Sequence, residues 1–74
     1  MTTYLTAKRL AALAKADRPA LARALASDKA REALSTTRAM CSMPAPQTLD
    51  ERAALMAAFF VMHPAARVDI TGTL

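Results

Sequence analysis

Apolar residues recur every three or four positions through the first forty residues, which is the spacing of one face of an α-helix. In the segment 6–16, Leu10 and Leu13 lead an apolar stripe, two lysines lie on the opposite side, and the initial threonine is a good cap. The sequence Asp-Arg-Pro at 17–19 then indicates a stop and a new start, because aspartate favours the cap position and proline the first turn. A second helix is expected over 19–26.

The pattern predicts a third helix from Asp28 to about Ser42. It is either separated from the second helix by a cap at Ser27 or continuous with it as one kinked helix over 19–42. We favour the break, because serine and aspartate side chains compete with the helix for backbone hydrogen bonds. The inward side of this third helix is expected to comprise Ala30, Ala33, Leu34, Thr37, Met40 and Cys41.

A proline-containing linker follows, because a residue before proline avoids the helical region and the third helix must therefore end by Met43. Thr48 and Glu51 then form a T-x-x-E capping box that opens a fourth helix over 49–62. The ten residues 53–62 are apolar on every side, whereas a surface helix normally has a polar face. The fourth helix is therefore predicted to be central.

The last residues form a tail, because Pro64 ends the fourth helix. Val68, Ile70 and Leu74 fall at even spacings, which suits either one short strand or a packed coil. We therefore predict that residues 1–74 form a single all-α domain with four helices. It consists of three short alanine-rich helices, the linker, one strongly apolar helix and a short extended C-terminal tail.

The composition argues against catalysis and for a partner. Nineteen of the 74 residues are alanine, Gly72 is the only glycine and Cys41 the only cysteine. A glycine-rich phosphate loop, an internal disulfide and a four-ligand zinc site are therefore excluded, and we expect no cofactor, no metal and no enzyme active site. A chain this short buries a core worth only about 3–5 kcal/mol, so we expect it to be stabilised by another subunit.

The fourth helix is the expected place for self-association, because three short helices can hardly enclose all of its apolar sides. We predict a homodimer through this helix, or a partner protein whose groove it fills. The alternative is that the three short helices, helped by the tail, do enclose it. The expected interface residues are Leu55, Met56, Phe59, Phe60 and Met62.

The net charge of +4 is unevenly distributed. Residues 1–38 carry eight basic and three acidic side chains, a balance of +5, whereas residues 39–74 carry two basic and three acidic, a balance of −1. Arginine is common at protein interfaces. The residues expected to contact a partner are Arg18, Arg23, Arg31 and Arg38. We accordingly predict a basic protein-binding module that acts as a stoichiometric inhibitor or adaptor, and its arginine and alanine bias suggests a bacterial or phage source.

The alternative function is a small DNA-binding regulator that uses residues 19–42 as a helix-turn-helix-like segment, with Lys29 and Arg31 at the start of the recognition helix. The turn lacks the usual glycine, and acidic residues 28 and 32 would face phosphates, so we rank this function second. The longest apolar run, ten residues, is half of a membrane span. We therefore expect no membrane partner and a cytoplasmic location.

Overall fold

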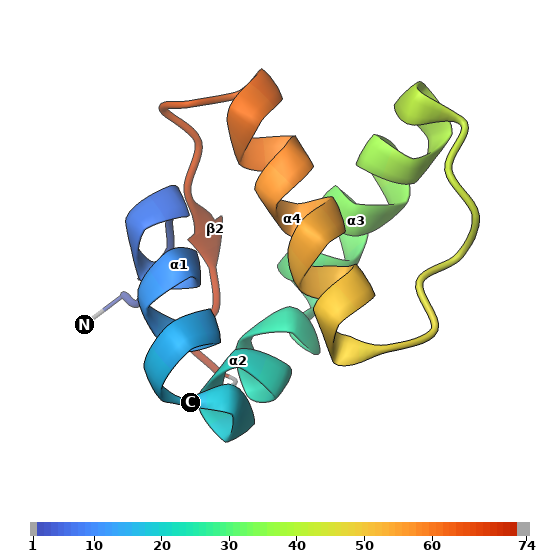
Figure 1. The fold of residues 1–74 in the computed structure, drawn as a ribbon. Helices are drawn as coiled ribbons and strands as arrows, with labels where there is room; N and C mark the ends of the chain where they lie inside the picture. The colour runs from blue at the N-terminus through green and yellow to red at the C-terminus, as the bar shows by residue number, and fades with distance from the viewer. Residues whose placement is uncertain (1, 73–74) are drawn as a thin grey trace.

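A computed structural model describes residues 2–72 and shows four helices with a small two-stranded sheet (Figure 1). The elements in chain order are β1 (Tyr4–Leu5), α1 (Ala7–Ala16), α2 (Arg18–Leu25), α3 (Asp28–Cys41), α4 (Leu49–Met62) and β2 (Val68–Asp69). The predicted all-α class with four helices is confirmed. The helix ends lie within one residue of the predicted ends.

Each helix begins at a short polar side chain that accepts a hydrogen bond from the backbone N–H three residues further on. These caps are Thr6, Asp17, Ser27 and Thr48. Such a cap satisfies one of the backbone donors that have no partner inside the helix. Because these signals are local in the chain, the sequence located all four helix starts.

The break between α2 and α3 is confirmed, and Ser27 stabilises it from both sides. Its hydroxyl accepts from the backbone N–H of Ala30 at 3.2 Å and donates to the carbonyl of Ala24 at 3.0 Å. The serine is itself buried. The turn between the two helices is therefore short and fixed rather than a kink in one helix.

The C-terminal end of α3 differs from the prediction. Met40 and Cys41 were expected to face inward, but both are exposed, Met40 by 63%. The ends of α3 and α4 diverge, so no neighbouring helix covers the last turn of α3 (Figure 1). Ser42 then ends the helix in the left-handed conformation, and the segment 43–48 runs back to the start of α4.

α4 lies between α1 and α3 (Figure 1) and contributes Leu55, Met56 and Phe60 to the core. Apolar side chains from every element contribute to it, namely Leu5, Leu10, Leu21, Leu25, Leu34, Leu55, Met56, Phe60, Val68 and Ile70. The prediction that α4 is central therefore agrees with the structure. The other elements bury Leu55, Met56 and Phe60 of this helix, whereas Val61 and Met62 are 78% and 37% exposed, so α4 is only partly enclosed.

The two ends of the chain pair with each other. β1 and β2 are antiparallel, with Tyr4 opposite Asp69 and Leu5 opposite Val68. The guanidinium of Arg67 lies 4.4 Å from the centre of the Tyr4 ring, a cation–π contact. The tail thus forms the short strand that its alternation allowed, while its partner strand at residues 4–5 was not predicted. The expected apolar position at residue 74 lies outside the described residues.

Candidate interaction surfaces

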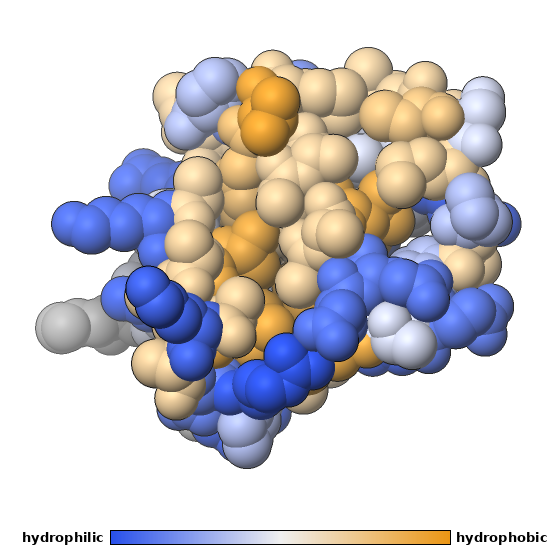
Figure 2. All heavy atoms as spheres, in the orientation of Figure 1, coloured by the Kyte–Doolittle hydropathy of each residue, from blue (hydrophilic) through white to orange (hydrophobic). Residues whose placement is uncertain are grey.

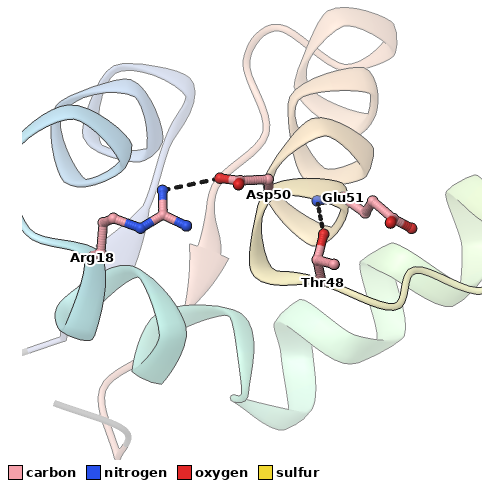
Figure 3. Close-up of polar contacts among 4 residues, drawn as sticks. All are labelled: Arg18, Thr48, Asp50 and Glu51. Carbon is pink, nitrogen blue, oxygen red and sulfur yellow. Dashed lines mark hydrogen bonds and ion pairs between the residues drawn. The ribbon is translucent and has the colours of Figure 1, made fainter.

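The four arginines expected to contact a partner do not share one surface. Arg18, at the start of α2, forms an ion pair with Asp50 in the first turn of α4 at 2.9 Å (Figure 3). Arg23 is exposed on α2, whereas Arg31 and Arg38 lie on the same side of α3. The structure therefore brings two of the four together.

The residues expected at the dimer interface lie mostly inside the chain's own core. Leu55, Met56 and Phe60 are each at most 3% exposed, and Phe59 is half-buried against the core. Met62 is 37% exposed. Three of the five side chains are therefore unavailable to a second copy. The sequence could not select the outward side of α4, because this helix has almost no hydrophobic asymmetry around its axis.

The outward side of α4 instead forms one wall of an apolar groove against α1. The groove has a volume of about 430 Å³. The α1 side chains that line it are Ala7, Leu10, Ala11 and Ala14. The α4 side chains that line it are Ala53, Ala54, Ala57, Phe60 and Val61. Figure 2 shows this face as a continuous apolar surface with polar residues at its margins.

Within this α1–α4 groove, Leu10 and Phe60 are buried and form the floor, while Val61 is 78% exposed at the rim. The Arg18–Asp50 ion pair, which is not part of the groove lining, joins the start of α2 to the first turn of α4 (Figure 3). Both of its side chains are more than half exposed, so the pair contributes at most about 1 kcal/mol to stability. Burial of apolar surface would therefore be the main contribution of this face to the free energy of binding a partner.

A second groove, of about 460 Å³, lies on the other side of α4, against α3 and the linker. Its polar lining consists of Arg31, Ser35 and Arg38 from α3 and Arg52 from α4. The rest of its lining is apolar, and no acidic residue contributes to it. The sequence missed Arg52 because this residue belongs to the half of the chain with negative net charge.

Other reactive side chains are dispersed. In the described range 2–72 there is no group of three or more histidine, cysteine, aspartate or glutamate residues that could hold a metal ion. The Thr71 hydroxyl and backbone N–H both donate to the Asp69 carboxylate, at 2.6 Å and 2.9 Å, and they hold its pKa below the ordinary value. This turn follows β2 and serves the local structure.

The helix-turn-helix-like arrangement of residues 19–42 is present in outline, with two helices joined at Ala26 and Ser27. Lys29 and Arg31, however, lie on opposite sides of α3. Lys29 is directed toward β2 and forms an ion pair with Glu32 at 3.8 Å, whereas Arg31 lines the groove beside α4. The two residues expected to contact DNA therefore do not present one surface to a duplex.

Comparison of the chain with models of protein families, with curated protein sequences and with solved structures gives no match. Within residues 2–72, every helix is too short or too polar to cross a lipid bilayer. The case for a function therefore rests on the two grooves that flank α4.

Proposed function

We propose that this chain is a small protein-interaction domain that self-associates through the α1–α4 groove and acts as an adaptor or inhibitor of a larger protein. The observation that carries the proposal is the uninterrupted apolar lining of that groove. A contiguous apolar face on a small soluble chain is a common mark of a protein-binding surface. A cytoplasmic location accords with the exposed, unpaired thiol of Cys41.

A second copy of the chain suits the shape of this face. Val61 projects from the rim and is 78% exposed. Ala54 and Ala57 on the same helix have small side chains, so the groove is shallow beside them. A twofold axis places the projecting residue of each copy against the small residues of the other, as in an isologous interface. Small side chains also allow two helices to approach closely.

The interface differs from the one expected from sequence in its residues but not in its helix. The outward residues Ala54, Ala57 and Val61 take the place of Leu55 and Met56, which are buried in the core, while Phe60 is buried at the floor of the groove. The argument for self-association from size is unchanged, because a chain this short buries little apolar surface and gains little stability on its own.

The test is the molar mass in solution of the wild type, Val61→Asp and Met40→Asp, measured by light scattering over a concentration series. Met40→Asp is the matched control, because Met40 is also an exposed apolar residue near the end of a helix, 63% exposed, but lies outside the groove. We expect a dimer of twice 7.9 kDa for the wild type and Met40→Asp, and a folded monomer for Val61→Asp.

A wild-type chain that stays monomeric at every concentration would contradict the self-association. A Val61→Asp chain that still forms the dimer would show that another surface makes it. Circular dichroism of all three chains establishes that the helices are retained.

A further inference from the structure

The groove between α3 and α4 has the composition of an anion site. Arg31, Ser35 and Arg38 follow one another at spacings of four and three residues, which places them on a single stripe of α3. Arg52, in the first turn of α4, completes the groove from the opposite wall. Three guanidinium groups therefore line one concave surface.

Within residues 2–72, no ion pair neutralises these three positive charges. Among residues 2–72 the ion pairs are Arg18–Asp50 and Lys29–Glu32, and neither includes a groove arginine. Arg38 donates from Nε to the carbonyl of Met43 at 3.2 Å, which anchors its side chain to the linker. That bond uses one of five N–H donors, so the fork that recognises a carboxylate is still available.

The floor of the groove is apolar. Leu25, Leu34 and Leu55 all line it and are almost completely buried, and Pro46 closes it from the linker. A cationic rim around an apolar floor matches a ligand that carries negative charge beside an apolar side chain. The volume, about 460 Å³, suits a few side chains, whereas a nucleic-acid backbone carries the negative charge but no apolar side chain for the floor.

We propose that the α3–α4 groove binds an acidic segment of a partner protein. The carboxylates of this segment pair with Arg31, Arg38 and Arg52, and an adjacent apolar side chain packs on the leucine floor. This proposal concerns a different face of the molecule from the α1–α4 groove. It therefore adds a site to the proposed function and defines the chemistry of the partner.

The test uses a fluorescein-labelled peptide of alternating glutamate and leucine, with fluorescence anisotropy as the measurement of binding. A matched peptide has glutamine in place of every glutamate. The protein variants are Arg31→Gln/Arg52→Gln and the control Arg9→Gln/Lys15→Gln, which has the same net charge and changes exposed residues of α1. All are also prepared with Val61→Asp, so that loss of self-association and loss of peptide binding are distinguished.

We expect saturable binding by the wild type and by Val61→Asp. The groove variant should bind roughly tenfold more weakly or worse, the control within about twofold of the wild type, and the glutamine peptide should not saturate. Equal losses in the two double variants would overturn the proposal, because they would reflect net charge alone. It would also be overturned if the wild type failed to bind the glutamate peptide, or if a DNA duplex displaced this peptide at a lower concentration than unlabelled peptide does.

Discussion

Replacement of Met56 by alanine distinguishes a residue of the monomer core from a residue of an interface. The sequence pattern assigned Met56 to the dimer interface, whereas the structure buries it completely, at 0% exposure. Met40→Ala is the matched control, because it makes the same chemical change at a side chain that is 63% exposed. Both positions are helical, so the small gain in helix propensity from alanine cancels in the comparison.

The expected magnitude follows from burial. Truncation of a fully buried methionine to alanine removes its transfer energy and leaves a cavity, at a cost of about 2–5 kcal/mol. A core of this size supplies only about 3–5 kcal/mol, so Met56→Ala should lose most of the free energy of unfolding. Met40→Ala should change it by no more than about 0.5 kcal/mol, as is usual for an exposed site.

The assay is urea unfolding followed by far-ultraviolet circular dichroism, with both changes made in the Val61→Asp chain so that self-association adds nothing to stability. With a slope of about 1 kcal/mol per molar urea for a small domain, the midpoint for Met56→Ala should fall by about 2 M or more. Its helical signal should be partly lost even without urea. Midpoints for Met56→Ala and Met40→Ala within about 1 M of each other would refute the assignment of Met56 to the core.

Two further predictions concern local geometry. Ser42 ends α3 at φ 52°, a conformation that costs a side-chain-bearing residue about 1 kcal/mol more than glycine, so Ser42→Gly should raise the urea midpoint measurably. Thr71→Val should move the pKa of the Asp69 carboxyl back toward its ordinary value in a nuclear magnetic resonance titration, because the hydroxyl is the largest cause of its lowering. Since the folded-state pKa is lowered, this contact stabilises the fold above the ordinary carboxyl pKa, and the stabilisation is lost as the pH falls through the lowered value. An unchanged midpoint for the glycine variant, or an unchanged Asp69 titration, would contradict the respective geometry.

The sequence could predict the helix boundaries because their causes are local. Thr48 accepts a hydrogen bond from the backbone N–H of Glu51 at 3.1 Å, and both residues lie within one turn of the chain. The prolines of the linker act on their immediate neighbours in the same way. Even here the structure differs in detail, since the Glu51 carboxylate accepts from the N–H of Gln47 rather than from that of the cap residue.

Burial on α4 could not be predicted, because it is decided by packing between distant elements. Leu55 and Val61 are both apolar and on the same helix, yet one is 2% and the other 78% exposed. Only the positions of α1, α3 and the strands separate them. The two-residue strand at Tyr4 could not be predicted from the sequence either. A strand this short has no alternation of apolar and polar residues to detect, and it forms only when β2 lies beside it.

The distribution of charge along the chain is the poorest guide to the candidate sites, because the linker brings together charges that lie far apart in the sequence. Arg52 lies in the half with a balance of −1, but the return of residues 43–48 along α3 brings it to the groove that contains Arg31. The two proposed sites then occupy opposite sides of α4, with Arg52 and Leu55 on one and Ala54 and Val61 on the other. A second copy in the α1–α4 groove therefore does not cover the arginines. If both proposals hold, the dimer would present two acidic-segment sites at once, which would raise the affinity for a partner with repeated acidic segments and would favour an adaptor over a simple blocking inhibitor.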